Sequence, residues 1–189
     1  NQQGYLNGHV PVSAFYAFCA ILTAHLYNIP HIAFSNERSS DESNVEYLGH
    51  HINHQYSKSL EFETDLNHLI TQSLSHFVTC FSFLRPLYEL QITKLFCTYP
   101  QYFDVFTSCN QNFKLNSNQK DLWCGKCPKC VSTALMLTCF IGKDGVAKIM
   151  GSYPPDQQVN HETMKQLLGE LPTKPFECVL TRSEAQAAV

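Results

Sequence analysis

Four cysteines near the middle of the chain constrain its fold more than any other feature of the sequence. Cys109, Cys124, Cys127 and Cys130 follow the spacing C-x14-C-x2-C-x2-C, and Gly125 comes directly after the second of them. Gaps of two residues let neighbouring thiolates converge on one tetrahedral ion, and a glycine permits the tight turn that this requires. The spacing therefore predicts a metal centre, with zinc as the favoured ion and an iron–sulfur cluster as the alternative.

The predicted metal centre is structural. Four sulfur ligands leave no coordination position open for water, so we expect the ion to hold the fold together and to take no part in catalysis. Four lysines lie near the ligands in the sequence: Lys114, Lys120, Lys126 and Lys129. We expect them to compensate the negative charge of the thiolates, and a patch that binds RNA or phosphate is the alternative.

Composition and charge exclude several classes of protein. The 189 residues are 44% hydrophobic, which suits a folded domain, and a net charge of −3 provides no global attraction to nucleic acid or anionic lipid. The longest apolar runs, within residues 10–24 and 131–142, are too short or too interrupted to cross a bilayer. No secretion signal opens the chain. We therefore expect a cytoplasmic protein with no membrane partner, for which a nucleic-acid partner is not expected.

The remaining cysteines do not form an obvious disulfide framework, because the total of nine is odd. Four of them lie among apolar residues and are expected to be small core side chains: Cys19, Cys80, Cys97 and Cys139. Cys178, in the run KPFECVLT, is less easily assigned.

Hydrophobic periodicity predicts alternating helices and strands. Helices are expected within residues 9–28, 57–76, 85–99, 131–142 and 161–168, and strands at residues 31–35, 78–84 and 104–108. The first helix should bury one face, because apolar residues recur in it at steps of three and four: Val12, Phe15, Cys19, Leu22 and Leu26. This order of elements predicts a layered α/β fold whose sheet is at least partly parallel.

Several longer runs carry a family resemblance. FLRPLYELQITKLF, DVFTSCN and WCGKCPKC resemble the C-terminal half of pyrophosphate-loop ATP-using enzymes, such as the deazaguanine synthase of the queuosine pathway. Together with LNGHVPVSAFYAFCAILTAHLY, IAFSNERSS, INHQYSKSLEFE and KPFECV, they resemble the UDP-N-acetylmuramoyl-L-alanyl-L-glutamate epimerase family of bacterial peptidoglycan synthesis. The resemblance covers roughly residues 4–181.

The resemblance implies a fold and an activity. The fold would be part of a three-layer α/β structure with a mostly parallel sheet, of the adenine-nucleotide alpha-hydrolase-like type. Residues 1–108 would form this partial core, 109–140 the zinc module with its following helix, and 141–189 an extension packed on the same domain. The activity would be an isomerase reaction that uses ATP and Mg²⁺ to convert the terminal L-glutamate of the UDP-muramoyl dipeptide to D-glutamate, through adenylation of its carboxylate.

One element of the family is absent from the chain. The family's nucleotide loop, of the Ser-Gly-Gly-x-Asp-Ser type, has no match here. We therefore expect a C-terminal fragment that is inactive alone and whose partner is a missing N-terminal half with that loop. The alternatives are a queuosine-type synthase that acts on a deazapurine or tRNA, and a non-enzymatic zinc-binding scaffold.

Charged residues near the strand ends are candidates for binding nucleotide and metal. Glu37 and Arg38 follow the first predicted strand, where Glu37 could hold Mg²⁺ and Arg38 a phosphate or carboxylate. Arg85 follows the second strand and Lys94 lies on the next helix, so either could face a nucleotide phosphate. A solvated loop is the alternative for the first pair, and ordinary salt bridges are the alternative for the second.

Four further residues are candidates for catalysis. Lys58 lies where a helix is expected to begin, which is unfavourable for a cation unless it binds an anion there. His54 could carry a proton, or it could be a hydrogen-bonded loop residue. In KPFECVLT, Glu177 and Cys178 could form the acid and base pair of an epimerase, because a thiol can take and return a proton at carbon. A buried core position is the alternative for Cys178.

Overall fold

The computed structural model describes residues 11–74, 77–114 and 121–189, which fall into two compact units. Unit 1 comprises Asn1–Asp41 and Asn53–Pro86, and unit 2 comprises Glu42–Ile52 and Leu87–Val189. The boundaries expected after residues 108 and 140 do not coincide with this division, because residues 87–108 belong to the same unit as the cysteine cluster.

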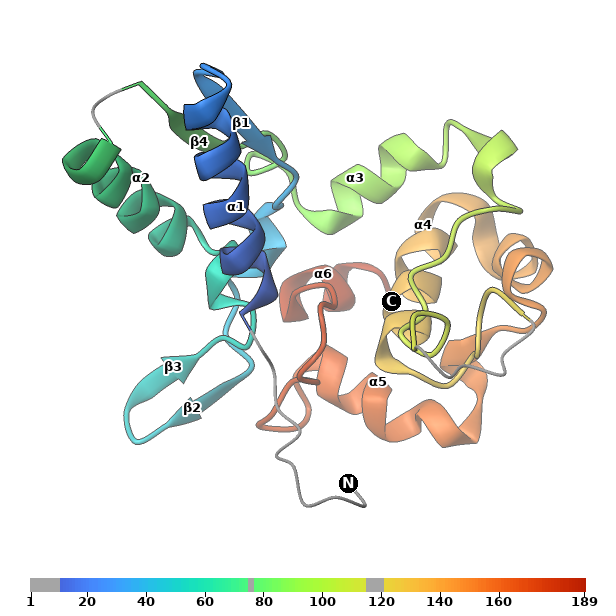
Figure 1. The fold of residues 1–189 in the computed structure, drawn as a ribbon. Coiled ribbons are helices and arrows are strands. Elements are labelled where there is room, and N and C mark those ends of the chain that lie inside the picture. Colours follow the sequence, from blue (N-terminus) through green and yellow to red (C-terminus); the bar gives the residue numbers. More distant parts are fainter. Residues whose placement is uncertain (1–10, 75–76, 115–120) are drawn as a thin grey trace, which may run out of the picture. The chain divides into compact units, whose positions relative to one another are not determined.

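Unit 1 is a small α/β structure (Figure 1). Its elements are α1 (Val12–Leu26), β1 (His31–Phe34), η1 (Arg38–Asp41), η2 (Tyr56–Lys58), α2 (Leu60–Leu74) and β4 (Thr79–Ser82). The strand β1 pairs in parallel with β4, with Ile32 opposite Cys80. Parallel neighbours require a crossover connection, and α2 supplies it. The predictions of α1, β1, α2 and β4 are therefore confirmed in kind, and so is a parallel pairing.

The helix α1 packs through a different face from the predicted one. Ala17, Ile21 and Ala24 are its buried residues. The five residues predicted to be buried are not; Leu22 and Leu26, for example, remain 59% and 67% exposed. The helix contains no Asp, Glu, Lys or Arg, so nearly every side of it is apolar and periodicity alone cannot select the packed face. The two alanines allow close approach to the neighbouring elements.

The sheet of unit 1 is covered on one face. Ile32, Phe34 and Cys80 point toward α1 and α2 and form the core with them. On the opposite face, Ala33 and Phe81 are exposed. The described part of unit 1 thus has two layers, where three were expected.

The prediction of a third strand at residues 104–108 is wrong. The segment forms turns, in which the backbone N–H groups of Val105 and Phe106 both donate to the carbonyl of Tyr102 at 3.2 Å. Phe106 then packs against Phe96 and Trp123, at ring-centroid distances of 4.7 and 5.1 Å. The apolar side chain of Phe106 in this segment therefore packs in an aromatic cluster beside Cys109, and the segment joins no sheet.

Unit 2 is mainly helical. Its elements are β2 (Val45–Tyr47), β3 (His50–Ile52), α3 (Glu89–Phe96), η3 (Pro100–Tyr102), α4 (Pro128–Met150), η4 (Pro154–Asp156), η5 (Gln158–Asn160), α5 (His161–Leu168) and α6 (Arg182–Ala187). The strands β2 and β3 form an antiparallel hairpin that the sequence did not predict. The helix α4 belongs to two cores, one around the cysteine cluster and one with Leu167, Val179 and Leu180.

The helix α4 is longer than the apolar run expected at residues 131–142. Within the described ranges it is the one helix whose length and composition would allow it to cross a membrane, and half of its apolar window is buried inside the protein. Gly142 interrupts it with φ 69° and ψ 169°, which are not helical values. Its burial and its interruption at Gly142 indicate that α4 is a core helix made of two segments.

Candidate metal centre and strand-end cavity

The four cysteines predicted to bind a metal lie together in unit 2. Their sulfur atoms are all within 4.8 Å of one another. The Cys124–Cys130 and Cys127–Cys130 pairs are 3.8 and 3.5 Å apart, and Cys127 is 4.0 Å from Cys109. A tetrahedral ion with metal–sulfur bonds of about 2.3 Å would separate its ligands by about 3.8 Å. The arrangement therefore fits one ion bound by four sulfurs.

Backbone groups are directed at the sulfurs. The N–H groups of Lys126 and Cys127 donate to Cys124 Sγ at 3.4 and 3.3 Å, and the N–H of Cys124 donates to Cys109 Sγ at 3.4 Å. The turn between these residues depends on Gly125, whose φ of 67° lies in the left-handed region, as its position in the motif predicted. Such donors stabilise negative charge on sulfur, which a bound cation would also require.

The thiols influence one another strongly. The hydrogen bond between Cys127 and Cys130 lowers the pKa of Cys127 to about 4, whereas that same bond and burial raise the pKa of Cys130. Burial also raises the pKa of Cys124. One thiolate thus opposes ionisation of its neighbours in the absence of a cation. A divalent ion among the four sulfurs would remove this conflict, because it favours ionisation of all of them.

Glu177, in the KPFEC segment, lies near this cluster of cysteines. Burial, followed by the nearby Cys127, raises the pKa of Glu177, while a hydrogen bond from the backbone N–H of Lys129 opposes the shift. Lys129 lies in the first turn of α4, so the Glu177 carboxylate caps that helix from outside. Cys178 is half-buried beside it. The structure therefore places Glu177 next to the cysteine cluster.

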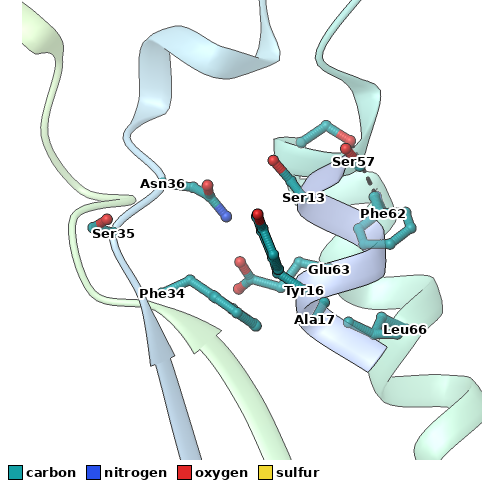
Figure 2. Close-up of a pocket in the computed structure, with 11 residues that line it drawn as sticks. Ser13, Tyr16, Ala17, Phe34, Ser35, Asn36, Ser57, Phe62, Glu63 and Leu66 are labelled. Carbon is teal, nitrogen blue, oxygen red and sulfur yellow. Dashed lines mark hydrogen bonds between the residues drawn. The ribbon is translucent and has the colours of Figure 1, made fainter. Parts of the chain in front are cut away.

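A cavity in unit 1 lies at the carboxyl end of β1, between α1 and α2, and has a volume of about 160 Å³. Figure 2 shows the Glu63 carboxylate and the Asn36 amide directed into it, with Tyr16 facing them from α1. Phe62 and Leu66 form part of its apolar wall. Asn36 and Glu63 lie in two of the runs that carry the family resemblance, IAFSNERSS and INHQYSKSLEFE, but the sequence assigned neither of them a role.

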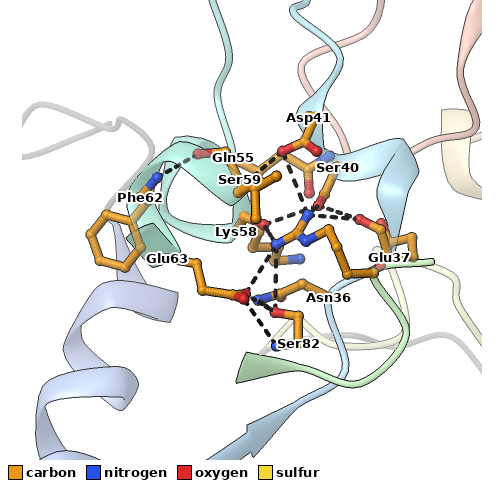
Figure 3. A network of polar contacts seen from close by, with 12 residues as sticks. Asn36, Glu37, Ser40, Asp41, Gln55, Lys58, Ser59, Phe62, Glu63 and Ser82 are labelled. Atoms are coloured by element: carbon orange, nitrogen blue, oxygen red, sulfur yellow. Dashed lines mark hydrogen bonds and ion pairs between the residues drawn. The ribbon is translucent and has the colours of Figure 1, made fainter. Parts of the chain in front are cut away.

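Beside this cavity, Arg85 forms a network of hydrogen bonds and ion pairs with the neighbouring loops (Figure 3). The guanidinium donates to the backbone carbonyls of Glu37 and Lys58 at 3.1 and 2.7 Å. It also pairs with Glu63 at 3.4 Å and with Asp41 at 3.5 Å. The Arg85 side chain is only 13% exposed. Arg85 thus joins the loop after β1, the turn before α2 and α2 itself, and its role toward a phosphate stays a prediction.

The other candidates divide between the two units. Glu37, Arg38, His54 and Lys58 belong to unit 1, on the segments that follow β1 and precede α2. Lys94 is exposed in the last turn of α3, in unit 2. The helix that was expected to begin near Lys58 begins at Leu60 instead. The Ser59 hydroxyl accepts a hydrogen bond from the backbone N–H of Phe62 at 3.1 Å and so caps this helix, α2.

The core positions of the remaining cysteines were predicted with mixed success, and charge compensation by the nearby lysines stays a prediction. Cys80 is buried and Cys97 is partly buried, whereas Cys19 and Cys139 are exposed, so the prediction of core positions is wrong for these last two. Lys120, one of the lysines near the metal ligands, lies outside the described residues.

The fold and the cysteine cluster define a mixed α/β protein with a candidate metal centre. Comparison with known families assigns it more closely. Residues 1–83 match the MurL N-terminal domain, and residues 105–189 match the MurL C-terminal domain. The chain belongs to the MurL family. No solved structure matches it.

Curated relatives align along the entire chain. Proteins from Micromonospora sp., Salinispora tropica and Xanthomonas oryzae pv. oryzae are 38%, 37% and 35% identical to it. Each is named UDP-N-acetyl-alpha-D-muramoyl-L-alanyl-L-glutamate epimerase. All 189 residues are covered, and they span 42%, 41% and 42% of the lengths of these three relatives.

Proposed function

We propose that the protein is an ATP-dependent isomerase that converts the terminal L-glutamate of UDP-N-acetylmuramoyl-L-Ala-L-Glu to D-glutamate in the cytoplasm. The supporting observation is the alignment of the whole chain with three relatives that carry this epimerase name. The deazapurine and tRNA alternatives gain no support from these names.

The proposed chemistry depends on activation of the glutamyl carboxylate. The α-proton of a carboxylate is very weakly acidic, because its loss places a second negative charge beside the first. Adenylation by ATP with Mg²⁺ removes the carboxylate charge and creates an acyl group that can delocalise the carbanion. The enzyme then needs a proton acceptor on one face of the α-carbon and a donor on the other. His54, Lys58, Glu177 and Cys178 are the candidates for these two roles.

We propose a structural zinc ion for Cys109, Cys124, Cys127 and Cys130. The support is the fit of four sulfurs to one tetrahedral ion, since a multi-iron cluster would attach its cysteines to different irons and hold the sulfurs further apart. The ion would fix the turn at Gly125 and the start of α4. It would take no part in the reaction, because all four of its positions are filled by protein.

We further propose that unit 1 is part of a larger, three-layer sheet with the nucleotide loop on another segment of a longer polypeptide. Two features support this: the exposed sheet face at Phe81 and the exposed apolar residues of α1 such as Leu22. In that setting Glu37 would hold Mg²⁺, and Arg38, Arg85 and Lys94 would be the candidates for phosphate.

The function is tested with the protein extended to the length of its curated relatives. The extended protein is incubated with the UDP-muramoyl dipeptide, ATP and Mg²⁺ in D₂O, followed by chiral analysis of glutamate, mass spectrometry and measurement of AMP. We expect D-glutamate with one solvent deuterium at the α-carbon and AMP formation that requires the dipeptide. AMP formation that instead depends on a deazapurine acid or tRNA would contradict the proposal, and so would the absence of D-glutamate.

The same assay separates the candidates for proton transfer. Replacing a true proton carrier should abolish both deuterium incorporation and D-glutamate. Cys178→Ala, Glu177→Gln and His54→Ala are compared with Cys139→Ala, a change at an exposed cysteine of α4. A variant that keeps full deuterium exchange is excluded from the role. Metal content is measured for each, because Glu177 lies beside the cysteine cluster and Cys178 follows it in the chain.

A further inference from the structure

The residues just before β2 are bonded to the KPFEC segment (residues 174–178), and both belong to unit 2. Asn44 donates from Nδ2 to the carbonyl oxygen of Pro175 at 2.7 Å, across 131 positions of the sequence. The carbonyl oxygen of Asn44 accepts the backbone N–H of Lys174 at 2.8 Å. Asn44 is only 2% exposed. Because these bonds are shielded from water, they hold the backbone firmly where the KPFEC segment begins.

The carboxylate of Glu42 holds the same stretch of chain at two further points. It forms an ion pair with the ammonium group of Lys174, whose side chain is 3% exposed. Both of its oxygens also accept the backbone N–H of Arg182, at 3.1 and 3.2 Å. Glu42 therefore ties together the two ends of residues 174–182.

The two candidates for proton transfer in unit 2, Glu177 and Cys178, lie between these ends. The chain after them is anchored to α4, because the N–H of Leu180 donates to Ser132 Oγ at 3.1 Å and the Leu180 side chain is fully buried. The backbone that carries Cys178 is thus fixed on one side by α4 and on the other by the residues before β2.

The chemistry of this attachment favours precision over stability. An ion pair taken out of water is a poor source of stability, because the loss of hydration offsets most of the attraction between the charges. Its bonds are directional, however, and they select one arrangement of the chain. Such selection suits a segment whose side chains must meet a reacting carbon to within about 0.5 Å.

We propose that Glu42 and Asn44 are positioning residues for the proton-transfer step of the reaction. They hold the KPFEC segment so that its side chains reach the α-carbon of the activated glutamate, and they themselves touch neither substrate nor ATP. The inference rests on the proposed function. Because adenylation is assigned to residues outside this segment, loosening the attachment should slow inversion of the α-carbon and leave adenylation intact.

The test compares these two steps in the protein extended to the length of its curated relatives. Adenylation is followed as dipeptide-dependent exchange of labelled pyrophosphate into ATP, and inversion as formation of D-glutamate. For Glu42→Gln and Asn44→Ala we expect kcat for D-glutamate to fall at least about ten-fold, with less than about two-fold change in exchange and in KM for the dipeptide. Glu46→Gln, at an exposed position of β2, is the matched control and should change neither rate.

The ratio of the two rates separates positioning from a merely structural role. A variant that is partly unfolded loses exchange and inversion in equal proportion, so the ratio does not depend on the folded fraction. A ratio equal to that of the wild-type protein in both Glu42→Gln and Asn44→Ala would overturn the inference.

Amide hydrogen exchange in the 189-residue chain tests the attachment without any activity. The amides of residues 174–182 should exchange faster in Glu42→Gln and Asn44→Ala than in the wild-type chain or in Glu46→Gln. Unchanged exchange would overturn the inference.

Failure of this inference is distinguishable from failure of the proposed function. An extended wild-type protein that makes no D-glutamate would contradict the function. An active wild-type protein whose variants keep the ratio of inversion to adenylation would overturn the positioning roles of Glu42 and Asn44 alone.

Discussion

Asn160 donates hydrogen bonds from Nδ2 to the carbonyl oxygens of Gly125 and Pro154, both at 2.8 Å. The asparagine is fully buried, and Gly125 forms the tight turn between two of the cysteines of the candidate metal centre. A single side chain from η5 therefore fixes the turn on which the geometry of the centre depends.

Replacing Asn160 should destabilise the protein and loosen the metal centre. Asn160→Ala leaves two carbonyl oxygens without their donor in a buried environment, so we expect a loss of about 2–4 kcal/mol in the free energy of unfolding. Urea denaturation measures this loss, and the rate of metal transfer to a chelator should rise. Gln158→Ala, at an exposed neighbour on η5, is the control. Equal stability of the two variants would show that Asn160 does not hold this turn.

Arg85 should be essential to the stability of unit 1. Arg85→Met leaves the Glu63 carboxylate, which is 14% exposed, without its cation and removes the bonds to two loop carbonyls. Breaking a buried pair in this way costs roughly 3–5 kcal/mol, and we expect the lower end of that range because water reaches part of the network. Lys94→Met, on the exposed surface of α3, should change stability by less than about 0.5 kcal/mol. Denaturation of the two variants gives the comparison, and similar midpoints would contradict the role of Arg85.

The two faces of α1 should respond differently to the same substitution. Ile21 is 4% exposed, so Ile21→Glu buries an unpaired charge and should prevent unit 1 from folding. Leu22 is 59% exposed, so Leu22→Glu should keep the fold of the 189-residue chain and reduce its self-association. Circular dichroism and light scattering measure both effects. A destabilised Leu22→Glu variant would show that this residue is packed in solution.

The helix α1 packs through a different face from the one that its sequence predicted. It shows what sequence patterns can and cannot determine. The spacing of Cys124, Cys127 and Cys130 allows only a few geometries, so the cluster was predictable from the sequence. The face of α1 was not, because an apolar helix offers several faces and tertiary packing selected the one with alanines.

Other misses have different physical causes. The hairpin β2–β3 turns at Leu48 and Gly49, both with positive φ, and leucine is an uncommon residue in such a turn. The network of Arg85 joins Glu37, Lys58 and Glu63, which are far apart in the sequence from Arg85 and reach it only through the folded loops. The cavity arises from the same tertiary arrangement.

Stability should fall in alkaline solution through Cys80. Burial, followed by the nearby Glu63, raises the pKa of the Cys80 thiol from 9.0 to about 11. Between these values the unfolded chain releases the proton while the folded chain retains it, so the folded state is favoured less as the pH rises from about 9 to 11. Cys80→Ala should flatten this part of the pH profile of unfolding. An unchanged slope in the variant would contradict the assignment to Cys80.

The metal centre provides the most direct test of the account as a whole. Zinc and iron are measured in the purified 189-residue chain, which is then followed by circular dichroism during heating before and after complete removal of metal by a chelator. We predict one zinc per chain, no iron, and loss of the cooperative unfolding of unit 2 once the zinc is removed. Iron with acid-labile sulfide, or a metal-free chain with unchanged secondary structure and melting temperature, would contradict a structural zinc site at the four cysteines.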